Sequence, residues 1–249
     1  MSISQHPFGV TPNGEKVTEY TMTNRDGASV SMLDFGGIVT RILVPDRDGK
    51  LDDVNLSFDD IDVYARDRSG SMGHAHRSGG QPHPRRVLRA GGPGAHTRCP
   101  KKQTTATSAR RHGLRPAHVA GKGRVLAEGG DALELTLTSQ DGDQGFPGTL
   151  KVKVTYTFTD HNELGIHYQA STDKTTLCSL TNHAYFNLDG HASGSVRDLE
   201  MQINADLVTE VGEGLIPTGR LLPVSEVPYN LPLPPASGMC WTKCPNAPA

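Results

Sequence analysis

A histidine flanked by polar and aromatic residues is the most suggestive chemical feature of this 249-residue chain. It is His183, in the string Thr181-Asn182-His183-Ala184-Tyr185-Phe186-Asn187-Leu188. An imidazole titrates near neutral pH, so it can donate or accept a proton during a reaction. Asn182 and Tyr185 could hold the polar groups of a small molecule. From these neighbours alone, a structural histidine in or beside a strand is the commoner explanation, and Tyr185 and Phe186 could be ordinary strand residues.

Carboxylates could supply the second group that proton-transfer chemistry needs. Asp141 and Asp143 flank glycines before Pro147, which favours turn formation over catalysis. Glu210 and Glu213 could be imagined as a base, but surface solvation is the simpler explanation for both.

Histidines and basic residues gather between residues 66 and 124. Six histidines and Cys99 lie in this segment, but no CxxC or HxxxH spacing supports a zinc site, so we expect no metal. Its fourteen lysines and arginines could attract nucleic acid. The segment has no aromatic residue for base stacking and no recognisable motif, so we expect no nucleic-acid partner.

Composition divides the chain into unlike regions. Residues 66–124 contain one acidic residue, whereas the rest of the chain has eleven basic and twenty-six acidic residues. This segment lacks the alternating apolar residues that would repay the entropy of ordering the backbone. Residues 232–249 are rich in proline, which excludes a central strand. We therefore expect residues 66–124 and 232–249 to be poorly ordered, with weak amide protection against hydrogen exchange.

The remaining regions have the patterns of β-strands. Apolar residues alternate with polar ones over Leu133–Leu137, Leu150–Phe158 and Leu164–Tyr168, which is typical of half-buried antiparallel strands. The β-prone runs Thr18–Thr23, Ser29–Leu33 and Ile38–Val44 are separated by turn residues rich in Gly, Asn and Asp. Repeated short strands without amphipathic helices indicate an all-β sandwich or barrel.

Composition also limits the setting of the protein. The formal net charge is -2, no apolar run is long enough to span a membrane, and the N-terminus lacks the pattern of a signal peptide. We expect a soluble cytoplasmic protein with no membrane partner. The four cysteines are too few and too unevenly spaced for a disulfide scaffold.

Several strings, in order along the chain, resemble those of the aldose 1-epimerase (galactose mutarotase) family. They are Asp34–Thr40, Val44–Lys50, Asp53–Asp59, Asp141–Gly148, Thr181–Leu188 and Gly214–Gly219. The resemblance covers roughly residues 1–65 and 125–230. It implies one large, twisted, antiparallel β-sandwich domain over residues 1–249, of the galactose mutarotase type but incomplete.

The resemblance also implies a function, the interconversion of the α and β anomers of an aldose such as galactose or glucose. The reaction is general acid–base catalysis and needs no cofactor. It implies His183 as the acid acting on the ring oxygen, with Asn182 and Tyr185 contacting the sugar. We expect His183 on the concave face of the sandwich, exposed to solvent and close to Tyr185 or Asn182. Extended strand geometry would place His183, Tyr185 and Asn187 on one face.

Other motifs of the family are missing. No string here matches its GR-ANRI and LHGG motifs, and the resemblance ends near Leu231, before an Asp in a GYDH motif and a catalytic Glu. Two compensating reading-frame shifts around residues 66–124 would explain the change in composition. We expect little or no mutarotase activity, and the alternative is a non-catalytic carbohydrate-binding remnant of the same fold.

Overall fold

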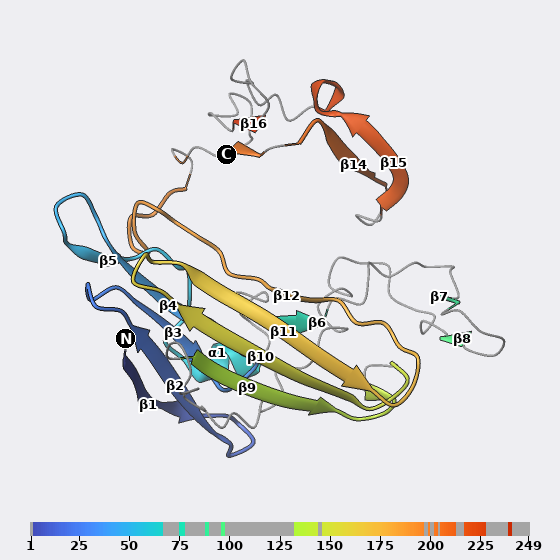
Figure 1. Cartoon of the computed structure of the whole chain (residues 1–249), viewed down its shortest axis with the longest axis horizontal. Coiled ribbons are helices and arrows are strands. Elements are labelled where there is room, and N and C mark those ends of the chain that lie inside the picture. Colours follow the sequence, from blue (N-terminus) through green and yellow to red (C-terminus); the bar gives the residue numbers. More distant parts are fainter. Residues whose placement is uncertain are drawn as a thin grey trace. The chain divides into compact units, whose positions relative to one another are not determined.

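The computed structural model describes residues 2–66, 132–143, 146–196, 205–212 and 217–227, with short segments at 75–77, 88–89, 96–97, 199, 202–203 and 239–240. The chain divides into two compact units, Met1–Phe186 and Asn187–Ala249. The first unit contains both of the larger sheets, coloured blue and green to yellow in Figure 1.

The first sheet is an antiparallel meander of five strands in chain order. Two turns between its strands need a positive φ, which glycine adopts without steric cost. Gly27 (φ +85°) lies in the turn after β2, and Gly49 (φ +80°) lies in the turn before β5. The strands are β1 (Ser2–Val10), β2 (Lys16–Thr23), β3 (Ser29–Leu33), β4 (Val39–Pro45) and β5 (Leu51–Asp53).

The second sheet has three antiparallel strands in the order β11-β10-β9. They are β9 (Ala132–Ser139), β10 (Leu150–Phe158) and β11 (Leu164–Thr172). On the central strand β10, every second side chain is buried, beginning with Leu150. This alternation gives the sheet one apolar face, which must pack against another element.

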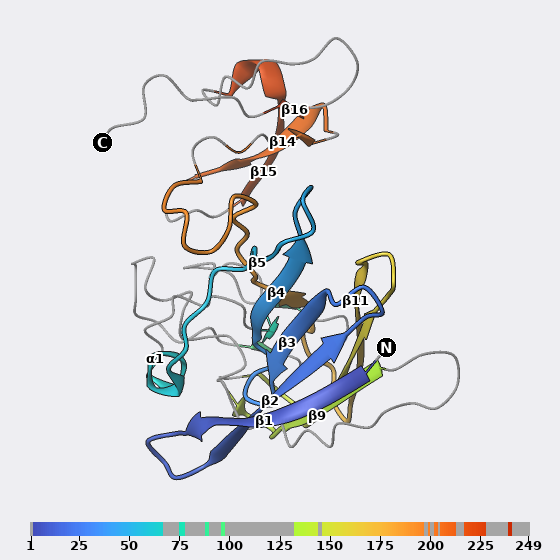
Figure 2. The same ribbon diagram turned by 90° about the vertical axis from the view of Figure 1, so that its left-hand side faces the viewer.

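Side chains of both sheets form one apolar cluster, so the two sheets pack as the layers of a sandwich. Figure 2 shows the strands of the first unit from the side. Burying one large apolar side chain stabilises the fold by roughly 1.5–3 kcal/mol relative to exposure. The fully buried members include Met22, Val30 and Met32 of the first sheet and Leu133, Leu135, Leu150, Tyr156 and Phe158 of the second.

A second apolar cluster joins the first sheet to the short helix α1 (Ile61–Ala65). Asp60 caps the helix, since its carboxylate accepts a hydrogen bond of 2.8 Å from the Asp62 N–H. Ile61 and Tyr64 are buried in the cluster, and the Tyr64 hydroxyl accepts a hydrogen bond of 2.8 Å from the Phe58 N–H. Burial raises the pKa of that hydroxyl.

The other elements are short. In the first unit, β12 (Leu180–Asn182) pairs with β6 (Ala75–Arg77), and β7 (Leu88–Arg89) pairs with β8 (His96–Thr97). The second unit contains the pair β13 (Gln202–Ile203) and β16 (Met239–Cys240). It also contains the hairpin β14 (Leu207–Val211) and β15 (Pro217–Pro223), followed by one 3-10 turn, η4 (Val224–Glu226).

The expected all-β, mostly antiparallel fold is confirmed. Most of residues 66–124 and 232–249 lies outside the described residues, so the poor order expected there stays a prediction. The expectation of a single truncated domain over residues 1–249 also stays a prediction. None of the helices among the described residues has the length and apolar character needed to cross a bilayer.

Candidate active site

His183 and Tyr185 lie in an irregular segment that directly follows β12. The strand ends at Asn182, whose side-chain oxygen accepts a hydrogen bond of 2.9 Å from the Ala184 N–H. This Asx-type bond turns the backbone out of the strand conformation. The turn therefore carries His183 past the end of the strand.

The rings of His183 and Tyr185 lie against each other. Their centroids are 4.9 Å apart and their planes are inclined by 41°. Both side chains are exposed, and Tyr185 retains 42% of its accessible surface. The expected exposure of His183 and its proximity to Tyr185 are confirmed. Its place on the concave face and its catalytic role stay predictions. An exposed imidazole beside an aromatic ring can reach a proton of a bound small molecule and offer it an apolar face.

The expected alternation along this segment is wrong. His183 and Tyr185 are exposed, but so is Phe186, whereas Asn187 is 1% exposed. The period of two fails because β12 has only three residues and the Asx turn follows it. Asn187 is the first residue of the second unit, where its side-chain Nδ2 donates a hydrogen bond of 2.8 Å to Ser193 Oγ.

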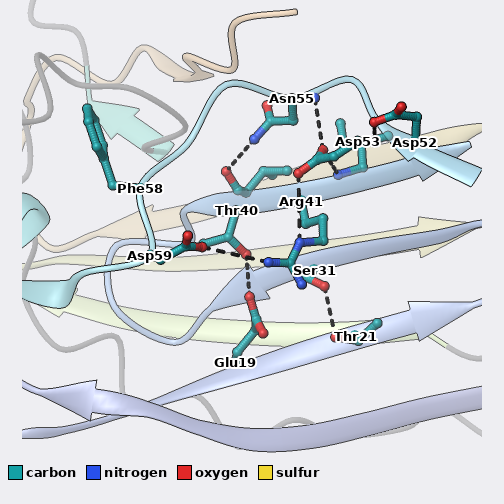
Figure 3. A network of polar contacts seen from close by, with 12 residues as sticks. Glu19, Thr21, Ser31, Thr40, Arg41, Asp52, Asp53, Asn55, Phe58 and Asp59 are labelled. Atoms are coloured by element: carbon teal, nitrogen blue, oxygen red, sulfur yellow. Dashed lines mark hydrogen bonds and ion pairs between the residues drawn. The ribbon is translucent and has the colours of Figure 1, made fainter. Parts of the chain in front are cut away.

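The backbone after Tyr185 is held by the segment that follows β5. The Leu56 N–H donates a hydrogen bond of 2.9 Å to the Tyr185 carbonyl, and Asn55 forms an antiparallel bridge with Phe186. Asn55 is fully buried, and its amide donates a hydrogen bond of 3.1 Å to the Val39 carbonyl on β4. Figure 3 shows Asn55 among the polar groups that surround β4. Composition and periodicity gave no sign of this support, because it joins segments about 130 residues apart.

The other neighbour of the site comes from the basic segment. The backbone of β6 pairs with β12 so that His76 lies opposite Thr181 and Ala75 lies opposite Asn182. Residues 75–77 therefore lie beside the start of the candidate site. Sequence reasoning missed this neighbour because three residues carry no usable periodicity.

Asp141 and Asp143 shape a turn, as the sequence favoured. Asp141 accepts a hydrogen bond of 2.6 Å from the Gly148 N–H and pairs with Lys174. The Lys174 ammonium, and then the Gly148 N–H, hold the pKa of the Asp141 carboxyl below its usual range. Asp143 accepts a hydrogen bond of 2.7 Å from the Ser139 hydroxyl.

Glu210 belongs to the second unit, on β14. It accepts a hydrogen bond of 2.6 Å from the Thr218 hydroxyl and pairs with Arg220 at 3.2 Å. Across the β14–β15 hairpin these contacts make Glu210 a cross-strand partner. Glu213 lies outside the described residues.

Among the residues that the structure describes, no three His, Cys, Asp or Glu side chains are grouped to hold a metal ion.

Comparison with known proteins decides the family. The model of the aldose 1-epimerase family matches residues 18–239. The chain belongs to the aldose 1-epimerase family. The resemblance expected from the sequence strings is confirmed, and the matched range runs across residues 66–124.

Named relatives agree with this assignment. The chain is 33% identical over 248 residues to galactose mutarotase of Sus scrofa, and 32% identical over 240 residues to that of Homo sapiens. Both matches cover 94% of this chain and 66% of the relative. Aldose 1-epimerase of Escherichia coli is 30% identical over 227 residues, covering 89% of this chain and 62% of the relative. The chain thus spans about two thirds of the length of these relatives.

Solved structures support the fold. The GalM/aldose epimerase homologue from C. elegans matches with a TM-score of 0.67 and 28% identity, over 83% of this chain and 61% of that one. Galactose 1-epimerase from Lactobacillus acidophilus matches with a TM-score of 0.68 over 91% of this chain and 64% of that one. At 23% identity, the second likeness concerns the fold alone.

Proposed function

We propose that the chain is an aldose 1-epimerase that interconverts the α and β anomers of an aldose bound at the surface formed by His183 and Tyr185. The observation that carries the proposal is the exposed His183 imidazole, 4.9 Å from the Tyr185 ring, in a chain of the aldose 1-epimerase family. Galactose is the sugar named for several relatives, and glucose is a second aldose that could undergo the same chemistry.

Anomer interconversion requires two coordinated proton transfers. A base takes the proton of the C1 hydroxyl while an acid protonates the ring oxygen O5, so that the C1–O5 bond breaks and an open-chain aldehyde forms. Rotation about C1–C2 turns the other face of the aldehyde towards the C5 hydroxyl. The ring then closes with the proton transfers reversed, and no atoms or electrons are gained or lost.

His183 is the proposed acid at O5, because an imidazole can both give and retake a proton near neutral pH. The exposed Tyr185 ring is the proposed surface for the apolar face of the sugar. Asn182 is the proposed polar contact, and its side-chain oxygen also shapes the turn that presents His183.

We also propose that turnover by this chain is impaired. The Arg and His that the family's GR-ANRI and LHGG motifs would supply have no matching strings in residues 66–124. Loss of groups that hold the sugar in its reactive geometry lowers the rate severely. The alternative function is therefore sugar binding without turnover.

Polarimetry tests the catalytic half of this proposal. Freshly dissolved α-galactose and α-glucose are followed with the protein, with its His183→Ala variant and with buffer. We expect the wild-type protein to change the rate little. A strong acceleration that disappears in His183→Ala would overturn the impairment, and one that survives in the variant would overturn the role of His183.

The location of the protein in the cell and its partners are also proposals. We propose a cytoplasmic location, with no nucleic-acid or membrane partner. Binding of an unrelated DNA duplex that weakens steeply as salt rises would contradict the second point.

A further inference from the structure

The Asp53 carboxylate extends the pairing between β4 and the chain beyond the end of β5. β5 ends at Asp53, yet one carboxylate oxygen accepts backbone hydrogen bonds of 3.0 Å from both Ile42 and Asn55. The Val54 N–H donates in turn to the Ile42 carbonyl at 3.0 Å. The Asp53 carboxylate thus accepts hydrogen bonds that a backbone carbonyl would accept in the β4–β5 ladder. In this way it fixes the backbone of residues 54 and 55.

The chain that follows leads directly to the candidate site. Asn55 is fixed on one side to the Val39 carbonyl and on the other side bridges Phe186. The next residue, Leu56, donates to the Tyr185 carbonyl at 2.9 Å. A displacement of residues 54–56 would therefore move the backbone that carries the Tyr185 ring.

The charge of Asp53 matters less than its oxygen. Its second oxygen lies 3.7 Å from Arg41 Nε, and the Arg41 side chain is 47% exposed. Arg41 also reaches Asp59 at 3.7 Å, and that side chain is 94% exposed. The Arg41–Asp59 pair is exposed on both sides, so water screens it. The Asp53 side chain is only 16% exposed, but its pair with the half-exposed Arg41 guanidinium is long and is also partly screened. The two backbone hydrogen bonds lie on the side chain's buried flank, since Ile42 is 8% exposed and Asn55 is fully buried. Figure 3 shows Asp53 between Arg41 and Asn55.

We propose that Asp53 is a positioning residue of the active site: as a backbone acceptor it fixes residues 54–56 and, through them, holds Tyr185 against His183. This proposal rests on the proposed function, because Asp53 itself does not contact the sugar and would affect sugar binding only through Tyr185. The distance between the two rings is the quantity that it predicts Asp53 controls.

The test uses the full chain and reads the His183 ring directly. With the two ring centroids 4.9 Å apart, the ring current of Tyr185 should shift the His183 Hε1 resonance, and Tyr185→Leu should give the value without that ring. Asp53→Ala should move the resonance towards the Tyr185→Leu value and weaken galactose binding several-fold. Asp53→Asn, which keeps an acceptor oxygen, should restore both to the wild-type values. Arg41→Gln is the matched control for the ion pair and should leave both unchanged.

The outcomes separate positioning from general damage. Amide resonances of β10 report whether a variant keeps its core. A folded Asp53→Ala with an unchanged His183 resonance would overturn the proposal, as would an Arg41→Gln variant that loses the ring contact. If Asp53→Ala does not fold, Asp53→Glu displaces the carboxylate instead. It should move the resonance part of the way, and an unchanged resonance would overturn the proposal.

The same measurements distinguish this proposal from the proposed function. If galactose does not bind but the Asp53 variants move the His183 resonance as described, the positioning role of Asp53 is supported and the proposed sugar site is contradicted. If galactose binds equally well to a folded Asp53→Ala with an unchanged ring contact, the sugar site stands and positioning falls.

Discussion

Two buried tyrosine hydroxyls on neighbouring strands differ in their hydrogen bonding. Tyr156 on β10 is fully buried, and its hydroxyl donates a hydrogen bond of 2.9 Å to the Gly37 carbonyl. Burial, and to a lesser degree the neighbouring Tyr168, raise the pKa of the Tyr156 hydroxyl far above its usual range. The Tyr168 hydroxyl on β11 is also buried, but within the described residues it has no hydrogen-bond partner.

The two hydroxyls should therefore respond in opposite ways to removal. Tyr156→Phe leaves the Gly37 carbonyl without its donor and should lower the free energy of unfolding by about 1–3 kcal/mol. Tyr168→Phe removes a buried hydroxyl that forms no hydrogen bond within the described residues. It should therefore leave the free energy of unfolding unchanged or raise it slightly. Urea unfolding followed by fluorescence measures both. Equal losses in the two variants would contradict the hydrogen bonding described.

The sequence predicted the contact between His183 and Tyr185 but not what holds it. The two residues are close in the sequence and outside a regular strand, so their rings are able to meet. Their support depends on Asp53 and Asn55, which belong to another part of the sequence and act through backbone groups. Periodicity and local propensity cannot predict such a contact, because it forms only when segments distant in the sequence come together in the fold.

At the level of elements, alternation predicted the strands well where one face is buried. Leu150–Phe158 was expected as a strand and is β10, since its even positions must face the core. Alternation did not single out β1, because this edge strand contains Pro7 and exposes most of its residues. It also failed for α1, because five residues are too few to show a helical period.

The alternation on β10 gives a matched pair of substitutions. Leu150 is 1% exposed, whereas the adjacent Lys151 is exposed. Leu150→Ala should lower the free energy of unfolding by about 2–5 kcal/mol, since it leaves a cavity between the sheets. Lys151→Ala should change it by no more than about 0.5 kcal/mol. Chemical denaturation of both variants checks this. A large loss of stability in Lys151→Ala would mean that Lys151, and not Leu150, faces the core.

The turn around Asp141 should make stability depend on pH. The folded state lowers the pKa of this carboxyl, chiefly through Lys174 and then through the Gly148 N–H, so the folded state favours the ionised form. The stabilisation is fully present above the carboxyl's ordinary pKa and is lost as pH falls through the lowered folded value. The stability difference between wild type and Asp141→Asn should therefore shrink in acid. Lys174→Gln is the control and should show the same trend, while a difference that grows in acid would contradict the pairing.

At the level of the whole molecule, the chain combines a family match over residues 18–239 with a basic segment of different composition. The frame-shift hypothesis makes a direct prediction about the underlying DNA. Translated in the other two frames across codons 66–124 and beyond 231, it should encode the family's missing Arg, His, Asp and Glu motifs. Their absence from both frames would end the hypothesis.

The central claim is that an aldose binds at His183 and Tyr185, and an isotope-edited NMR titration with galactose tests it most directly. The ring resonances of both residues should shift and reach a plateau as galactose is added, while those of Tyr156, buried in the core, stay in place. The shift at His183 should disappear in Tyr185→Ala. No saturable change at either ring, or saturable changes only elsewhere in the chain, would contradict the account.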